Sequence, residues 1–360
     1  MPTLPLELIE LIIDQLSANR GDLRSCSLVS RSWLPRSSKH LFRSLCVSRG
    51  RRETLHVLCS LVLSSERMAT NIYSLSITID RSTANKAAPL LGHLPALHTL
   101  DISATLDLER CACPDATAQP GRHIEDLNLS SMPIDVVAYF LGLFSSVGTL
   151  AVRRCWQEGT VPRAHRVRCL GVIQLDGPAL RDMSRLVEPS TLQGIFFHFP
   201  PESPCLLPED VAHFFRVLGA HIQTLVYFVD PLCEEPVLDR QALQSCEALE
   251  SFEVLLPHEP AFHDDCWRSM LVALSALPPH TRNVRLVSSR ESTQGASNAL
   301  QSSDWKAVGC ALEHCSALER LQIKTPEPSS MSTACADEGD LQSIILISLS
   351  ERLRGITIFE

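Results

Sequence analysis

The sequence predicts an α/β protein with a small helical domain at residues 1–48, followed by an irregular solenoid of parallel strands with helical return arms over residues 49–360. Two observations lead to this prediction. Apolar residues recur at helical spacing through the first 45 residues, which is typical of amphipathic helices. After residue 70, a short apolar pattern recurs every 20 to 37 residues, and repeats of about this length build solenoids in which each unit packs on its neighbours.

The first helix is predicted from Leu8, Ile12 and Leu16, which recur at helical spacing. Ile9 and Ile13 widen this apolar stripe. Acidic residues between them are expected on the outside of the helix, namely Glu7, Glu10 and Asp14.

Two further helices are predicted before residue 48. Asn19-Arg20-Gly21 ends the first helix, and Asp22 is expected to cap the second. Pro35 fits the first turn of a third helix, because proline donates no hydrogen bond there. The apolar residues of the second helix are Leu23, Cys26, Leu28 and Val29, leading to Trp33, and those of the third are Leu41, Phe42 and Leu45.

The order and spacing of these residues resemble the F-box over roughly residues 3 to 47, about an eighth of the chain. The matching residues are Leu4-Pro5, Glu7-Leu8, Ile12, Leu16, Asp22-Leu23, Leu28-Val29-Ser30-Arg31, Trp33 and Leu41-Phe42. Pro35, close behind the tryptophan, departs from the family's pattern. The resemblance implies docking onto the Skp adaptor, and through it onto the cullin scaffold of a ubiquitin ligase. The docking residues that it implies are Leu4, Pro5, Leu8, Ile9, Ile12, Leu16, Leu23, Leu28, Val29 and Trp33.

A helical segment of about forty residues cannot bury a full apolar stripe by itself, so another surface must cover the remainder. Burial of each large aliphatic side chain is worth roughly 1.5 to 3 kcal/mol before the cost of ordering. A partner protein is one candidate for this surface. The other is the following domain, which the helices would then cap as terminal repeats cap a solenoid.

The repeated pattern after residue 70 is an apolar residue, two further residues, an apolar residue, one further residue and a third apolar residue. Examples are Leu97-Leu100-Ile102 and Ile222-Leu225-Tyr227. One copy is weaker, because Thr281 stands where the first apolar residue is expected. The middle residues of the copies are Leu75, Leu100, Leu127, Leu150, Leu170, Ile195, Leu225, Phe252, Leu321 and Ile356, with Val284 in the weaker copy.

The pattern resembles that of leucine-rich repeats, in which each copy supplies one strand and one return arm. Helical patterns precede several copies, at residues 136–144, 211–218, 267–277 and 305–312. The polar ladder residue of the family is mostly missing: Cys155 stands where an Asn or Cys is expected, but the equivalent positions in the second and third copies are Thr105 and Met132. Loops or insertions rich in Pro, Ser or Gly are expected at residues 111–121, 200–208, 288–303 and 326–340.

Side chains alternate between the two faces of a strand, so the neighbours of the core residues line the inner face of the sheet. That face runs from acidic and polar in the early copies, through apolar in the central copies, to basic in the late copies. Exposed apolar patches often mark interaction sites. Alternatively, a loop or helix of the same chain covers the central apolar residues, which are then ordinary core. The candidate target-binding residues are Phe196, His198, Val226, Phe228, Leu255, Arg285, Arg320 and Lys324.

Composition narrows the class of protein. The net charge of -9 argues against a nucleic-acid surface, which would need a basic stripe. The sequence has no apparent secretory signal and no apolar run long enough to cross a bilayer. The 14 cysteines are interpreted as free thiols of an intracellular protein, in the cytoplasm, the nucleus or both.

Candidate chemistry is sparse, and we expect neither a catalytic site nor a metal or other cofactor. Cys111, Cys113 and His123 offer zinc-ligand types without the paired spacing of a structural zinc site. The same holds for His258 with the segment His263-Asp264-Asp265-Cys266. A cysteine hydrolase stays formally open, because a nucleophile and its base need be close only in space.

The two resemblances together imply a non-enzymatic substrate adaptor of a cullin-RING ubiquitin ligase, with an F-box for the Skp adaptor and repeats for a target protein. The alternative is a repeat scaffold for protein interactions that acts outside a ubiquitin ligase. Adaptor binding without recruitment of cullin would favour the scaffold.

Overall fold

A computed structural model describes residues 4–47, 52–80, 83–105, 122–157, 164–198, 206–229, 236–256, 264–288, 304–324 and 338–359. The chain forms two compact units, Met1–Gly148 and Thr149–Glu360. Helices come first, and parallel strands then alternate with helices, which confirms the predicted fold class. The described strands form one all-parallel sheet whose order follows the sequence from β1 to β12.

The first unit begins with three helices, α1 (Leu6–Gln15), α2 (Arg20–Val29) and α3 (Leu34–Arg43). Pro35 lies in the first turn of α3, as predicted. The cap of α2 is Asn19 rather than the expected Asp22. The Asn19 side chain accepts hydrogen bonds from the backbone N–H groups of Gly21 and Asp22, at 3.0 and 3.3 Å, so the helix begins three residues earlier than predicted.

The third helix is shorter than predicted, because a strand that the sequence did not indicate follows it directly. α3 ends at Arg43, and β1 runs over Ser44–Val47. Leu45, expected on the helix, instead pairs in register with Leu75 of the next strand. Leu45 and Val47 alternate along β1, so both follow the strand period of two rather than the helical period.

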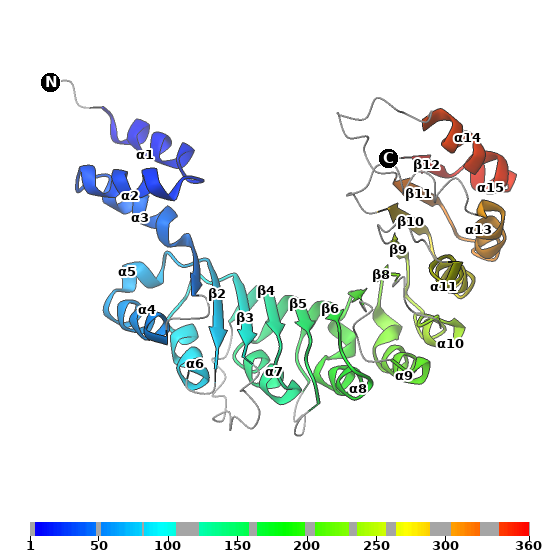
Figure 1. Ribbon diagram of the computed structural model, residues 1–360, viewed down its shortest axis with the longest axis horizontal. Coiled ribbons are helices and arrows are strands. Elements are labelled where there is room, and N and C mark those ends of the chain that lie inside the picture. The colour runs from blue at the N-terminus through cyan, green and yellow to red at the C-terminus, as the bar shows by residue number, and fades with distance from the viewer. Residues whose placement is uncertain are drawn as a thin grey trace. The chain divides into compact units, whose positions relative to one another are not determined.

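The rest of the first unit alternates strands with helices. Helices α4, α6 and α7 lie on the same side of the strands (Figure 1). Its elements are α4 (Arg52–Ser64), α5 (Glu66–Ala69), β2 (Ser74–Ile79), α6 (Ala84–Gly92), β3 (Thr99–Ala104), β4 (His123–Ser130), α7 (Ile134–Leu141) and the start of β5 (Ser146–Arg153).

The second unit continues the alternation, with α8, α9, α10, α11 and α13 on one side of its strands (Figure 1). Its elements after β5 are β6 (Val167–Ile173), α8 (Gly177–Leu186), η2 (Pro189–Thr191), β7 (Gly194–His198), α9 (Pro208–Leu218), η3 (Gly219–His221), β8 (Thr224–Phe228), α10 (Arg240–Leu243), β9 (Ser251–Leu256), α11 (Asp264–Ser275), β10 (Asn283–Ser288), α13 (Trp305–Leu312), β11 (Arg320–Lys324), α14 (Glu338–Ser348), α15 (Glu351–Arg354) and β12 (Thr357–Phe359).

The strand register confirms the repeat pattern within each unit. Leu75, Leu100 and Leu127 are direct neighbours across β2, β3 and β4. All three are fully buried, because they face the helical layer. In the second unit the aligned middle residues are Leu170, Ile195, Leu225, Phe252, Val284 and Leu321.

The last copy was predicted one residue out of register. Thr357, not Ile356, pairs with Leu321, and Phe359 pairs with Ile323. The backbone N–H of Ile356 still donates to Leu353 at the end of α15, so the strand begins only after that turn is complete. Ile358 consequently faces away from the helical layer and is 41% exposed.

The return arms predicted from helical patterns are present as α7, α9, α11 and α13. Aromatic packing holds one of them to its strand, since the ring of Phe197 on β7 lies 5.7 Å from Phe215 and 6.0 Å from Phe214 on α9. All three rings are fully buried. Thr281, the polar residue of the weaker copy, is also fully buried before β10.

Candidate docking surfaces

The three N-terminal helices share a small core of their own. Ile13 on α1 and Leu23 on α2 are fully buried, and Cys26 is nearly so. α3 packs against both other helices. The side of α1 that faces this core is therefore the one carrying Ile13, one helical turn beyond the half-buried Ile9.

A charged cluster fastens α1 to α3. Asp14 accepts hydrogen bonds from Arg36 Nε at 2.6 Å and Nη2 at 2.5 Å, and lies 2.7 Å from His40 Nε2. Asp14, expected on the outside of α1, is about one third exposed and faces α3 rather than open solvent. Hydrogen bonds from Arg36 and then His40 hold the pKa of Asp14 well below its usual value.

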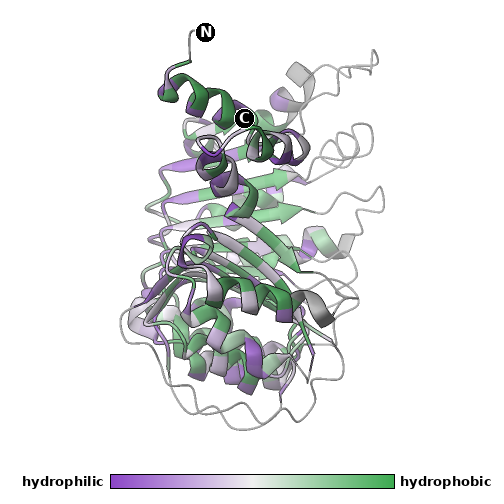
Figure 2. Ribbon diagram, turned by 90° about the vertical axis from the view of Figure 1, so that its left-hand side faces the viewer, coloured by the Kyte–Doolittle hydropathy of each residue, from purple (hydrophilic) through white to green (hydrophobic). Residues whose placement is uncertain are grey.

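Several large apolar side chains of α1 and α2 remain exposed to solvent. Most of the helix that follows the N-terminus is coloured as hydrophobic in Figure 2. Leu8 is 47% exposed, and Leu28 at the end of α2 is 86% exposed. The exposed apolar residues of this region, called the docking residues below, are Leu4, Leu6, Leu8, Leu11, Ile12, Leu28 and Val29.

The F-box resemblance implied ten docking positions, which differ in their exposure to solvent. Leu4, Pro5, Leu8, Ile12, Leu28 and Val29 are exposed, whereas Ile9, Leu16 and Trp33 are half-buried. Leu23 is fully buried, so it packs the three helices together and offers no surface to a partner. Leu6 and Leu11 are exposed but were not among the implied positions. The feature of the sequence that could have identified them is their apolar character next to Leu8 and Ile12.

The helical region is joined to the sheet by polar contacts as well as by chain continuity. Arg20 Nη2 on α2 donates to the carbonyl oxygen of Leu41 at 2.9 Å and to that of Ser44, at the start of β1, at 3.5 Å. The guanidinium of Arg43 lies 5.3 Å from the ring centroid of Tyr73, and the Tyr73 N–H donates to the Arg43 carbonyl at 2.9 Å.

The second candidate surface is the face of the sheet opposite the helices, in the second unit. Strand register places Phe196, Val226, Glu253 and Arg285 side by side across β7 to β10. Two residues further along the same strands, it aligns His198, Phe228 and Leu255. Lys324 belongs to this second row.

The aromatic side chains of this surface contact one another. The His198 ring lies 4.1 Å from the Phe228 ring and 6.3 Å from the Phe196 ring, between their centroids. All three are half-buried, so neither phenylalanine is fully covered by its own chain. Burial, and secondly the charge of Arg153, lowers the pKa of His198, which favours the neutral imidazole at pH 7.

The three candidate cations of the late strands lie in three different rows. Arg285 is 3.6 Å from Glu253, between Nη1 and Oε2, so an acidic neighbour offsets its charge. Lys324 aligns with Val287, while Arg320 is exposed and aligns with Asn283. The register therefore does not combine the three into a single basic cluster.

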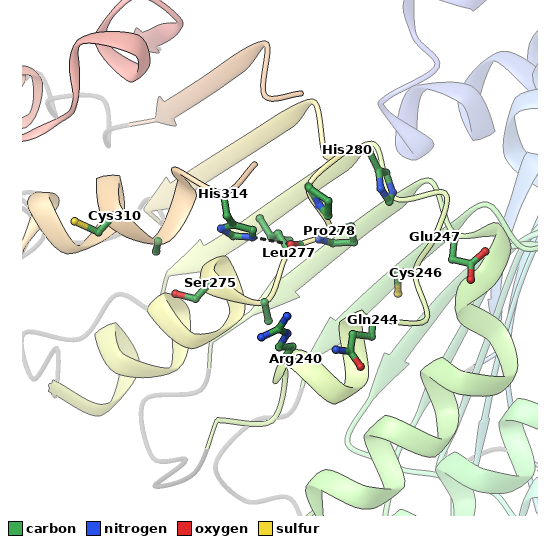
Figure 3. A pocket seen from close by; sticks show the side chains of 13 residues that line it. Arg240, Gln244, Cys246, Glu247, Ser275, Leu277, Pro278, His280, Cys310 and His314 are labelled. Carbon is green, nitrogen blue, oxygen red and sulfur yellow. Dashed lines mark hydrogen bonds between the residues drawn. The ribbon is translucent and has the colours of Figure 1, made fainter. Parts of the chain in front are cut away.

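A pocket of about 650 Å³ lies at α10, α11 and α13 of the second unit (Figure 3). Arg240, Gln244, His280 and His314 contribute polar groups, and His314 Nε2 lies 2.7 Å from the Leu277 carbonyl oxygen. Burial raises the pKa of the Cys246 thiol to about 12. That thiol is protonated at neutral pH, which makes it a poor nucleophile for a hydrolase.

In the described parts of the chain, no group of three or more His, Cys, Asp or Glu residues is placed to hold a metal ion. Of the candidate ligands, Cys111, Cys113, His258 and His263 lie outside those parts. His123 is described, and its Nδ1 lies 2.8 Å from the hydroxyl of Ser146. Within the same residues, no helix has the length and apolar character to cross a membrane.

No model of a known protein family matches this chain. A search of curated proteins also finds no match.

Proposed function

We propose that this chain is a substrate-recognition adaptor of an SCF-type cullin-RING ubiquitin ligase. Its helices α1 and α2 would dock onto the Skp adaptor, which binds the cullin scaffold, and its sheet face would bind the target protein. The chain itself performs no chemistry in this proposal. It raises the effective concentration of the target's lysines at the site of ubiquitin transfer.

The exposure of the docking residues is the observation that carries this proposal. Leu8 and Ile12 on α1, and Leu4 just before it, are about half exposed, and Leu28 and Val29 on α2 are more so. The helices have a separate core around Ile13 and Leu23. Because apolar clusters on a protein surface mark interaction sites, these side chains favour a partner over a purely internal role.

The energetics of such an interface are sufficient for a stable complex. Each large aliphatic side chain gains roughly 1.5 to 3 kcal/mol when fully buried. Since Leu8, Leu28 and their neighbours are only partly exposed before binding, each gains part of that amount. Several together exceed the cost of losing translational and rotational freedom at the low end of its range, about 4 kcal/mol.

The test is co-purification of the intact chain with the Skp adaptor, compared with the variants Leu8→Arg and Leu61→Arg. Leu61 on α4 is 45% exposed and therefore matches Leu8 in exposure, but lies outside the docking residues. We expect Leu8→Arg to lose adaptor binding and Leu61→Arg to keep it. An intact, folded chain that does not bind the adaptor would refute the ligase proposal.

A second step separates the adaptor from the interaction scaffold. The complex of the chain with the Skp adaptor is mixed with cullin and analysed by size-exclusion chromatography. Recruitment of cullin into the same peak is expected of a ligase component. A complex that binds the Skp adaptor and excludes cullin would favour the scaffold.

A further inference from the structure

One row of side chains crosses seven neighbouring strands on the sheet face of the second unit. Register places Ile173, His198, Phe228, Leu255, Val287 and Lys324 next to one another from β6 to β11. Arg153 of β5 extends the row at the other end, because the next residue, Arg154, donates its N–H to the Ile173 carbonyl at 3.0 Å. We call these seven residues the cation-ended row.

The middle of the row is apolar and partly open to solvent. Ile173, Phe228, Leu255 and Val287 are all half-buried. The His198 ring contacts the Phe228 ring in a tilted arrangement, with 4.1 Å between the centroids and 54° between the ring planes. Burial and the nearby charge of Arg153 lower the pKa of His198, so it presents a neutral ring at pH 7. The row therefore offers five adjacent uncharged side chains to a ligand.

Both ends of the row carry a positive charge that the described part of the chain does not neutralise. Arg153 is exposed, Lys324 is half-buried, and neither forms an ion pair with a described residue. The acidic side chain Glu253 belongs to the neighbouring row, 3.6 Å from Arg285. A ligand that covers the apolar middle thus meets a cation at each end, which favours negative charge there.

The spacing of the strands determines how long such a ligand is. Seven adjacent strands have six gaps of about 4.8 Å each, which gives roughly 29 Å along the sheet. An extended peptide rises about 3.3 Å per residue. About nine residues therefore reach from one cation to the other.

We propose that the cation-ended row binds an extended segment of a partner protein, about nine residues long, with apolar side chains in its middle and a carboxylate at each end. The inference rests on the proposed function, in which this sheet face binds the target. It adds the chemistry of the segment that is bound. Apolar contact supplies most of the affinity, while the two carboxylates set the position of the segment and reject basic or neutral-ended ones.

The test uses two pools of synthetic peptides of nine residues, in which alternate residues face the sheet. In the first pool, Glu stands at both ends and an equal mixture of Leu, Ile, Val and Phe stands at the three inner positions facing the same side, with Ser elsewhere. The second pool is identical except for Gln at both ends. Each pool is passed over the immobilised full chain, retained peptides are identified by mass spectrometry, and their Kd is measured by calorimetry.

We expect the Glu-ended pool to be retained preferentially. The variants Arg153→Gln and Lys324→Gln are each expected to weaken binding about two- to fivefold, the effect of one exposed ion pair. Each variant is also expected to reduce, without abolishing, the preference for the Glu-ended pool over the Gln-ended pool, because one cation of the row remains. Lys306→Gln on α13 removes the same charge from the helical side and is the matched control, with unchanged binding expected.

Three results would overturn the inference. They are equal retention of the two pools, retention of neither pool, and unaltered affinity in the Arg153 and Lys324 variants. The same proteins are tested for Skp-adaptor binding, which Arg153→Gln and Lys324→Gln should leave intact. Leu8→Arg should in turn leave peptide binding intact. The experiment therefore distinguishes failure of the adaptor-docking proposal from failure of the proposal that the cation-ended row binds a peptide.

Discussion

Thr281 stands where the repeat pattern places an apolar side chain, and the structure buries it completely. Its hydroxyl has no hydrogen-bond partner among the described residues. A buried polar group without a partner loses its hydration and gains nothing in return. This residue is therefore a local weakness in the second unit, and one that a change of side chain can relieve.

We expect Thr281→Val, which keeps the shape of the side chain, to raise the free energy of unfolding by about 1 kcal/mol. The measurement is urea unfolding followed by circular dichroism. Thr224→Val is the matched control, because Thr224 is exposed on the sheet and its hydroxyl stays hydrated. A destabilised Thr281→Val variant would show that the hydroxyl is bonded after all.

His198 is expected to titrate below the ordinary histidine pKa of 6.5. Burial is the larger cause of the lowered pKa, and the charge of Arg153 is the second. Phe228→Ala should therefore raise the pKa of His198 by exposing its ring, and Arg153→Gln should raise it by a smaller amount. The folded protein then binds fewer protons than the unfolded chain between the two pKa values, so stability falls as the pH is lowered through that window. An NMR titration of the ring checks this order, and a midpoint above 6.5 would contradict it.

At the residue scale, the sequence predicts the faces of the strands better than those of the helices. Strand side chains alternate strictly between the two faces of the sheet. Once a residue such as Leu225 is assigned to the core, the faces of its neighbours follow. In α1 the apolar residues Leu8, Ile9, Ile12 and Ile13 occupy more than one face. The core-facing side is marked by contacts of Asp14 with Arg36 and His40, which lie 22 and 26 residues away in the chain. Local spacing carries no information about such contacts.

At the element scale, the charged cluster of Asp14 decides how firmly α1 is held. Its bonds to Arg36 and His40 link α1 to α3. Ile13 is the only residue of α1 that is buried, and Ile9 is half-buried. With so few attachments, we expect α1 to open more readily than helices such as α7, most of whose residues are buried.

Asp14→Asn should lower the hydrogen-exchange protection of α1, because the neutral amide loses the charge-assisted bonds to Arg36. Glu7→Gln, an equivalent change at an exposed position of α1, is the control and should leave protection unchanged. In the unmodified protein, the lowered pKa keeps this contribution present above the ordinary Asp pKa of 3.8 and removes it as the pH falls further. Equal protection in both variants would show that the cluster does not hold the helix.

Helices α8 and α9 meet closely at Gly177, the first residue of α8. A Cβ at this position would lie 2.8 Å from Cγ of Asp210, whose carboxylate is 3.0 Å from Arg181 Nε. We expect Gly177→Ala to destabilise the protein by about 1 to 3 kcal/mol in thermal or urea unfolding. Gly355→Ala is the control, because its nearest neighbour would be an oxygen at 3.6 Å, an ordinary contact. Two variants of equal stability would contradict the close packing.

The sequence predicts the long helices of this chain but not its short N-terminal strand. The long return arms α9, α11 and α13 follow from their apolar periodicity. β1 has only four residues, too few for a period of two to stand out from the helix before it. Its identity as a strand comes from pairing with β2, a contact between residues about 30 positions apart.

For the molecule as a whole, β1 changes where the helical domain can be removed. A chain that begins at Ser44 keeps the pairing of Leu45 with Leu75 and of Val47 with Ile77. A chain that begins at Arg49 loses β1 and leaves the edge of β2 unpaired. β1 is itself an edge strand, but it has only four residues, whereas β2 has six. Short edge strands protect a sheet from association between chains, and longer free edges promote it. The two truncations differ by only five residues, yet they should behave differently.

We expect the chain that begins at Ser44 to stay monomeric and folded, and the chain that begins at Arg49 to associate and to unfold at a lower temperature. Size-exclusion chromatography with light scattering and a thermal unfolding scan measure both properties. The intact chain is the reference. If the two truncated chains have the same mass in solution and the same unfolding temperature, β1 contributes nothing to the sheet.

The direct join between α3 and β1 also bears on how such a protein can evolve. Arg43 ends the helix, Ser44 begins the strand, and Arg20 contacts the backbone of Ser44 from α2. With no spacer between them, a helical segment that is exchanged between genes at this junction has to end at the residue where the strand begins. It also loses the contact of Arg20 with Ser44 unless the new segment supplies an equivalent one. We therefore expect exchange of the helical segment to be tolerated only where the join leaves β1 whole.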